Sequence, residues 1–168
     1  MLDIINNLSI FFEDCYREFS VREYSRKMNI SPPTASKMLK SFAKEGLLVL
    51  RKERGFLLFK INRGSEVVRD LSLIYWKEKL TPLTDYLDEM LFPESIVLFG
   101  SLSKLEVRKE SDIDIAVFSK SKKKIDLSKF EKKLEREIQI FVFESLDKAG
   151  DELGKNIINS YKLGGFIS

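Results

Sequence analysis

The chain has 168 residues, of which 43% are hydrophobic and 33% charged, with a formal net charge of +3. This size suits one or two small globular domains, and no apolar run approaches the ~20 residues of a membrane helix, so no membrane contact is expected. The sequence holds no histidine, which excludes Ser-His-Asp and Cys-His catalysis. The single cysteine, Cys15, excludes an intrachain disulfide and indicates a cytoplasmic location.

The first sixty residues predict three helices and a β-hairpin. Apolar residues recur at helical spacing in the first helix, and Ser20 with Glu23 three residues later forms a capping box for the second. Ser31 caps the third helix, which tolerates two prolines in its first turn because the backbone N–H groups there are unpaired. A turn containing Gly55 joins two β-rich runs. The predicted elements span residues 3–18, 20–28, 31–46, 47–50 and 56–61.

This order of elements is that of a winged helix-turn-helix, and NISPPTASKMLKSFAKEGLLVLRKERGFLLFKI resembles the DNA-binding domains of many prokaryotic regulators. Between Ser20 and Ile61, ten basic residues stand against three acidic ones, a net +7, while the rest of the chain sums to −4. The charge is therefore concentrated where double-stranded DNA would be bound. The expected DNA contacts lie on the third helix and the wing: Thr34, Ser36, Lys37, Lys40, Arg51, Lys52 and Arg54.

Winged helices also serve as dimerisation or protein-docking modules, and charge runs are often only solvated faces. DNA binding and docking therefore both stay open for this half of the chain. By analogy with other winged-helix regulators, a homodimer is a further expectation.

Residues 62–91 are predicted to be helical, with a restart at Thr81-Pro82, because Thr81 can cap and Pro82 can take the first helical position. The stretch has no flexible composition and is interpreted as a helical connector. The predicted domains are residues 1–62, 63–92 and 93–168.

The second half predicts strands alternating with helices. A buried strand over 95–99 ends at Gly100-Ser101, and a second strand over 113–118 is apolar apart from Asp114. A basic loop, a helix, a strand and a closing helix follow, over residues 119–124, 126–136, 138–143 and 146–161. This order predicts a small mixed sheet flanked by helices, so the chain is expected to be of the α+β class.

Two aspartates mark the start of the second strand. Asp112 and Asp114 are two residues apart, so on a strand they share one face, about 6.5–7 Å apart. Two carboxylates at that distance repel by about 2–3 kcal/mol at an effective dielectric constant near 20. A cation would offset this repulsion, and oxygen ligands without thiolate or imidazole favour Mg²⁺. An ordinary turn with two solvent-facing acids would not explain their place on an otherwise apolar strand.

The whole stretch SIVLFGSLSKLEVRKESDIDIAVF resembles the signature of the DNA polymerase β-like nucleotidyltransferase superfamily, in particular its minimal nucleotidyltransferases. The resemblance implies that Asp112 and Asp114 are catalytic acids and Mg²⁺ ligands. It also implies that Gly100 and Ser101 cradle the phosphates of a nucleoside triphosphate, and that Ser111 shapes the turn into the strand. The implied reaction is in-line attack of a hydroxyl on the α-phosphate, with pyrophosphate leaving.

The chain departs from the family pattern at two positions. The third acid of the family is expected on the strand 138–143, where this chain has Gln139, and Glu137 is the nearest candidate substitute. An amide is a weak metal ligand and cannot take up a proton at accessible pH. Leu105 stands where the family often has glycine or another small residue.

Two functions therefore remain open. In the first, the chain is a DNA-binding, Mg²⁺-dependent enzyme that transfers a nucleotide to a hydroxyl of a protein or small molecule. In the second, the domain is catalytically weak or inactive and serves a transcriptional regulator or an antitoxin-like protein, whose partner would be encoded nearby. The intact GS and DID motifs favour the first, and the winged helix and Gln139 favour the second.

Overall fold

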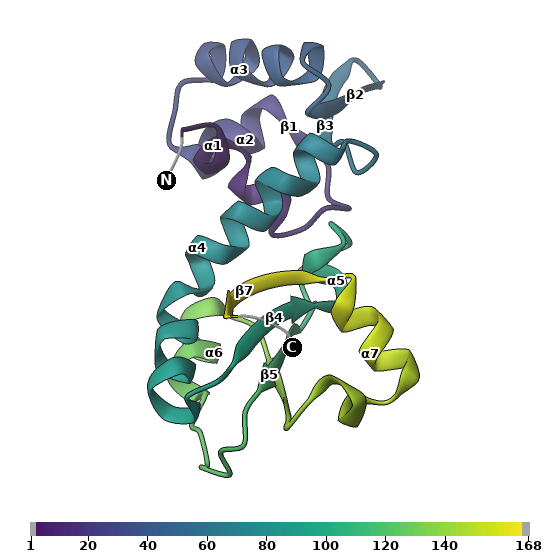
Figure 1. The fold of residues 1–168 in the computed structure, drawn as a ribbon. Coiled ribbons are helices and arrows are strands. Elements are labelled where there is room, and N and C mark those ends of the chain that lie inside the picture. The colour runs from purple at the N-terminus through teal and green to yellow at the C-terminus, as the bar shows by residue number, and fades with distance from the viewer. Residues whose placement is uncertain (1–2, 166–168) are drawn as a thin grey trace. The chain divides into compact units, whose positions relative to one another are not determined.

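A computed structural model describes residues 3–165. The chain forms two compact units (Figure 1). Unit 1 is built from residues 1–75 and 105–109, and unit 2 from residues 76–104 and 110–168. No helix within 3–165 is long and apolar enough to cross a membrane.

Unit 1 has the predicted winged helix-turn-helix order, with one additional short strand. Its three strands form an antiparallel sheet in the order β1-β3-β2, in which β1 pairs with β3. The two residues of β1 are too few to produce a sequence pattern, so the sequence does not predict this strand. The elements are α1 (Asp3–Phe12), β1 (Phe19–Ser20), α2 (Val21–Met28), α3 (Pro32–Lys44), β2 (Leu48–Glu53) and β3 (Phe56–Ile61).

The two helices of the helix-turn-helix begin where their caps predict. The Ser20 side chain accepts from the Glu23 N–H at 3.3 Å, and the Glu23 carboxylate accepts from the Ser20 N–H at 2.9 Å, which confirms the capping box. Ser31 caps α3 by accepting from the Thr34 N–H at 3.3 Å. Asn29 ends the preceding helix in the left-handed conformation, with a φ of 53°. These caps satisfy orphan backbone groups and fix the turn between α2 and α3.

Helix α4 (Glu66–Leu91) is one continuous helix of 26 residues, so the predicted restart at Thr81-Pro82 is wrong. The Thr81 hydroxyl donates back to the Lys77 carbonyl at 3.0 Å instead of capping a new helix. Burial of the apolar face on both sides of Pro82, at Leu80 and Leu83, favours continuing the helix.

Unit 2 contains a four-stranded mixed sheet in the order β6-β5-β4-β7. The β4–β5 and β4–β7 pairs are antiparallel, and the β5–β6 pair is parallel. Helices α6 and α7 lie on opposite sides of the sheet (Figure 1). The elements are β4 (Ser95–Phe99), α5 (Gly100–Ser103), β5 (Ile113–Phe118), α6 (Ser128–Leu134), β6 (Ile138–Phe143), the 3₁₀ turn η1 (Leu146–Ala149), α7 (Asp151–Ile158) and β7 (Tyr161–Gly165).

The end of the chain differs from the predicted helix over 146–161. A 3₁₀ turn and α7 occupy most of this stretch, and β7 then adds a fourth strand along β4. Gly165 lies so close to β4 that a Cβ on it would be 1.9 Å from the Glu94 carbonyl oxygen. A glycine pair normally indicates a turn, and this close approach explains why it lies in a strand here.

The segment 105–109, which connects α5 to β5, belongs to unit 1. The Cys15 N–H donates to the Val107 carbonyl at 2.8 Å, and Arg63 Nε donates to the Leu105 carbonyl at 3.1 Å. The side chains of Leu105 and Val107 are buried. The chain therefore passes from unit 1 into unit 2, returns for five residues, and leaves again, whereas the predicted domain limits at 62 and 92 follow only the sequence pattern.

Candidate functional site

Three polar or turn-forming features converge at one end of the unit 2 sheet. Asp114 on β5 lies in register with Phe99, the last residue of β4, and with Gln139 on β6. Asp112 lies just before β5 and shares the face of Asp114 because side chains two apart on a strand point the same way. Both aspartates are partly buried. The sheet register therefore brings together the GS turn, the DID motif and the predicted third-acid position.

Gly100 is the point of closest approach in this site. Its φ is +69°, and a Cβ built on it would lie 2.1 Å from Asp114 Oδ2. Glycine is thus required twice, once by the left-handed backbone and once by the carboxylate that occupies the space of a side chain. The short helix α5 begins at this residue, and the Ser103 hydroxyl closes it by donating to the Gly100 carbonyl at 2.9 Å.

The two carboxylates raise each other's energy in the absence of a cation. Partial burial raises the pKa of Asp114 above its ordinary value, and the neighbouring charge of Asp112 raises it further. Within residues 3–165 no group of three acidic, cysteine or histidine side chains gathers as a metal site. Asp112 and Asp114 are a pair of partly buried carboxylates at this end of the sheet.

Gln139 points its amide at the first aspartate. Its Nε2 donates to Asp112 Oδ2 at 2.8 Å. Because an ionised carboxylate only accepts hydrogen bonds, the amide satisfies one oxygen of Asp112 without adding negative charge. The third-acid position thus holds a hydrogen-bond donor rather than a metal ligand.

The predicted DNA-binding side chains are distributed over α3 and the wing formed by β2 and β3. Lys37 and Lys40 are exposed on α3, and Ser36 is partly buried. The Thr34 hydroxyl lies 2.8 Å from the hydroxyl of the cap residue Ser31, so it is already engaged within the helix terminus.

The three basic residues of the wing differ in their surroundings. Lys52 and Arg54 are exposed near the turn. Arg51 is held by two carboxylates: its Nη2 lies 2.6 Å from Glu18 Oε2 and 2.8 Å from Glu53 Oε2. The hydrogen bond from Arg51 lowers the pKa of Glu18. Sequence reasoning missed this pairing because Glu18 and Arg51 are 33 residues apart.

Comparisons with known proteins find a family match in each half of the chain. Residues 82–163 match the family described as "Polymerase beta, Nucleotidyltransferase", and residues 18–56 match "Iron dependent repressor, N-terminal DNA binding domain". The chain therefore carries a winged helix-turn-helix followed by a nucleotidyltransferase-like domain, each similar to one of these families. No curated protein matches it. A similar solved structure is titled "Possible transcriptional regulator from Methanosarcina mazei Go1", with 16% identity, 53% of this chain and 78% of that chain covered, and a TM-score of 0.34.

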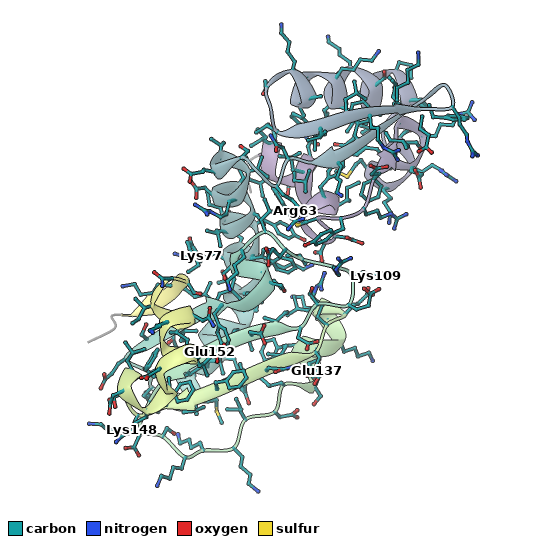
Figure 2. The ribbon with its side chains drawn as sticks, turned by 90° about the vertical axis from the view of Figure 1, so that its right-hand side faces the viewer. Arg63, Lys77, Lys109, Glu137, Lys148 and Glu152 are labelled. Atoms are coloured by element: carbon teal, nitrogen blue, oxygen red, sulfur yellow. The ribbon has the colours of Figure 1, made fainter. Side chains whose placement is uncertain are left out.

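The α+β fold class predicted from the sequence is confirmed by the structure and by these two families. In the nucleotidyltransferase-fold domain, Gly100, Asp112, Asp114 and Gln139 lie together as described. Ser101 follows Gly100 in α5 and is partly buried, and Ser111 directly precedes Asp112. Glu137 lies outside the strand, exposed at the start of β6 (Figure 2), where its carbonyl accepts from the Ile113 N–H at 2.9 Å.

Leu105 adopts the left-handed conformation, with a φ of 56°. That conformation costs a residue with a Cβ about 1–2 kcal/mol, so glycine would be favoured here by the backbone alone. The side chain of Leu105 is 1% exposed, so its burial offsets this cost. The departure from the family pattern at Leu105 therefore changes the side chain and leaves a glycine-like backbone.

The two aspartates fit one divalent cation. They supply oxygen ligands on one face, and Mg²⁺ is usually bound through one or two carboxylates together with substrate phosphates. The Gln139 donor on Asp112, and the lack of a third acid at the site within residues 3–165, do not fit a fully ligated pair of metal ions. Among residues 3–165, the donor set at this site is thus two carboxylates and one amide.

Changing Glu18 to glutamine should strengthen DNA binding. Arg51 would lose one of its two carboxylate partners and become more available to a DNA phosphate. We expect a lower Kd and a salt dependence steeper by up to about one phosphate contact. Fluorescence anisotropy with a labelled duplex over a salt series measures both. Glu66→Gln is the matched control, because it removes an acid that pairs with Arg69 on α4. Equal behaviour of the two variants would show that Arg51 makes no phosphate contact.

Changing Asp114 to asparagine should stabilise the metal-free protein at neutral pH. The folded-state pKa of Asp114 is raised, so its ionised form costs free energy at neutral pH, and this cost disappears as the pH falls through that pKa. We therefore expect Asp114→Asn to raise the Tm of the metal-free protein modestly at neutral pH and to lose this advantage in acid. Thermal unfolding over a pH series is the measurement. An unchanged Tm difference across the series would contradict the prediction.

Proposed function

We propose that the chain is a DNA-binding regulator whose nucleotidyltransferase-fold domain binds a Mg²⁺–nucleoside triphosphate and transfers nucleotide slowly or not at all. The observation that carries this proposal is the 2.8 Å hydrogen bond from Gln139 Nε2 to Asp112 Oδ2. A third carboxylate at this position would help bind the catalytic metal and activate the attacking hydroxyl. An amide does neither, because it has no negative charge and takes up no proton.

The residues of the site support binding by complementary charges. Asp112 and Asp114 would hold the cation, and the Gly100–Ser101 turn would contact the phosphates. Mg²⁺, when bound, would neutralise phosphate charge and relieve the repulsion between the two carboxylates. Partial burial and, to a smaller extent, the charge of Asp112 raise the pKa of Asp114, and cation binding gains because it relieves the repulsion between the two carboxylates.

The winged-helix domain supplies the second half of the proposed function. Lys37 and Lys40 on α3 and Lys52 and Arg54 in the wing are exposed cations on the two elements that winged helices use for DNA. The net charge of +7 between Ser20 and Ile61 favours a polyanionic partner. We expect duplex binding that weakens steeply with salt.

Calorimetry with each of the four ribonucleoside triphosphates, with and without Mg²⁺, tests nucleotide binding. Wild type should bind at least one of them only with Mg²⁺, and an Asp112→Ala/Asp114→Ala variant should not. Anisotropy with a random duplex at low salt tests DNA binding. A wild-type protein that binds no triphosphate, or no duplex, would overturn the corresponding half of the proposal.

A second candidate function is nucleotide transfer to a hydroxyl. The close approach of Gly100 to Asp114 favours it, because this turn keeps the metal-ligating carboxylate against the position expected for the phosphates. Incubation of wild type with α-labelled triphosphates and Mg²⁺, followed by electrophoresis and chromatography, distinguishes the two. Label transferred to protein or to a small acceptor supports the enzyme, and binding without transfer supports the regulator.

A further inference from the structure

A buried guanidinium lies beside the segment that carries the candidate metal ligands. Arg136 is only 8% exposed, although it is charged and lies between α6 and β6. Its Nη1 donates to the Ser111 carbonyl at 2.6 Å. The next residue in the chain is Asp112. Arg136 thus forms a hydrogen bond to the peptide unit between Ser111 and Asp112.

The surroundings of Arg136 favour an arginine over other residues. Its guanidinium carbon lies 5.4 Å from the centroid of the Trp76 ring, which is completely buried. A guanidinium is weakly hydrated and stacks on aromatic rings, so it can be buried at less cost than an ammonium. Buried charge is nevertheless expensive and is weak support for stability as such. At this position the guanidinium can fix the backbone geometry through its hydrogen bond to the Ser111 carbonyl.

The segment from Arg136 to Gln139 binds the segment from Ser111 to Ile113 at three successive points. Arg136 donates to the Ser111 carbonyl, Gln139 Nε2 donates to Asp112 Oδ2 at 2.8 Å, and the Glu137 carbonyl accepts from the Ile113 N–H at 2.9 Å. One bond holds the peptide before Asp112, one holds its carboxylate, and one holds the peptide after it.

Asp112 needs this support more than Asp114 does. Asp114 lies inside β5 between two strands, whereas Asp112 precedes β5 and lies outside its strand ladder. The two carboxylates repel each other, and Asp112 is the one whose backbone could move away. A fixed Ser111 carbonyl prevents that movement.

We propose that Arg136 is a positioning residue for the metal–nucleotide site, which holds Asp112 beside Asp114 through the Ser111 carbonyl. The inference rests on the proposed function and extends it to a residue outside the GS and DID motifs. Arg136 acts through the Ser111 carbonyl, which belongs to the peptide unit that precedes Asp112. Groups that orient metal ligands typically change metal affinity by about 10–100-fold when they are removed.

The first test measures the Mg²⁺ concentration that half-saturates nucleotide binding, by calorimetry at a fixed triphosphate concentration. Arg136→Met should raise it about tenfold or more, and Arg136→Lys, which retains charge and one donor, should raise it less. Arg69→Met is the matched control, because Arg69 is half exposed and pairs with Glu66 at the surface of α4, at 3.6 Å. A folded Arg136 variant with the wild-type Mg²⁺ requirement would overturn the proposal.

The second test needs no ligand. It also distinguishes a local loss of order at Asp112 from a general loss of stability in the Arg136 variant. Hydrogen exchange of the metal-free Arg136→Lys protein should accelerate at the amides of Asp112 and Ile113 and remain at the wild-type level over 115–118 in β5. Equal acceleration along all of β5 would show that Arg136 only stabilises the sheet, and would overturn a positioning role.

The two tests also separate this inference from the proposed function. If wild type binds no triphosphate at any Mg²⁺ concentration, the proposed nucleotide site fails. The exchange measurement then still decides whether Arg136 positions Asp112. If wild type binds a triphosphate, and the Arg136 variants have the same Mg²⁺ requirement and amide exchange as wild type, the proposed function stands and the positioning role fails.

Discussion

Replacing Gly100 by alanine should abolish Mg²⁺-dependent nucleotide binding while the protein remains folded. The new Cβ would lie 2.1 Å from Asp114 Oδ2 and 3.0 Å from Asp114 Cγ, so the carboxylate must leave its position. Displacement of the Asp114 carboxylate should weaken Mg²⁺-dependent nucleotide binding by about 100-fold or more. Both the proposed cation site and the Gly100–Ser101 turn depend on this contact. The left-handed backbone of Gly100 adds about 1–2 kcal/mol of strain.

Calorimetry and thermal unfolding of Gly100→Ala should therefore show lost binding with a moderate fall in Tm. Gly46→Ala is the matched control, since Gly46 also has a positive φ, of +77°, but nothing lies within 4 Å of its added Cβ. Gly46→Ala should carry the backbone strain alone and bind nucleotide normally. If Gly100→Ala also binds nucleotide normally, nucleotide binding does not require Asp114 to lie against the Gly100–Ser101 turn.

Changing Gln139 to glutamate should make the stability of the protein depend on Mg²⁺. Without metal, the variant loses the hydrogen bond to Asp112 and places a third carboxylate in the site, which should cost about 1.5–3 kcal/mol. With Mg²⁺, the third carboxylate becomes an additional oxygen ligand, and the Mg²⁺ needed for half-saturation should fall about tenfold.

Thermal unfolding with and without Mg²⁺ measures this change, and label transfer from α-labelled triphosphates shows whether the new carboxylate also permits chemistry. Gln139→Ala separates the two causes, because it removes the hydrogen bond and adds no charge. Its Tm should fall without becoming dependent on Mg²⁺. If the Tm of Gln139→Glu stays independent of Mg²⁺, the three acids do not hold a cation together.

Local chemistry explains the parts of the fold that can be predicted well from the sequence. The capping box of Ser20 and Glu23 and the cap at Ser31 act within three residues, and both are visible in the sequence. The GS turn and the DID strand are also local signals, and their spacing places Gly100 next to Asp114 across β4 and β5. The sequence pattern is thus sufficient to predict that Gly100 and Asp114 lie side by side, while their role in binding stays a prediction.

The features that sequence reasoning misses depend on contacts between distant parts of the chain. The β1 and β7 strands exist only because they pair with β3 and β4, and neither has a strand pattern of its own. Arg136 is one arginine among 29 basic residues in the sequence, and only the tertiary structure shows its guanidinium at the Ser111 carbonyl. The predicted restart at Pro82 is wrong because tertiary packing overrides local helix preference.

Because residues 105–109 belong to unit 1, the two units cannot be separated or exchanged as simple consecutive segments of the chain. A single cut anywhere in the chain cannot release either unit whole, since each is made of two separate stretches of sequence. A fragment ending at residue 92 would lack Leu105 and Val107 and leave the Cys15 N–H without its acceptor, the Val107 carbonyl. The winged helix therefore cannot be exchanged as a cassette at its carboxyl end. Any recombination that replaces it must also replace residues 105–109, between the Gly100–Ser101 turn and the two aspartates.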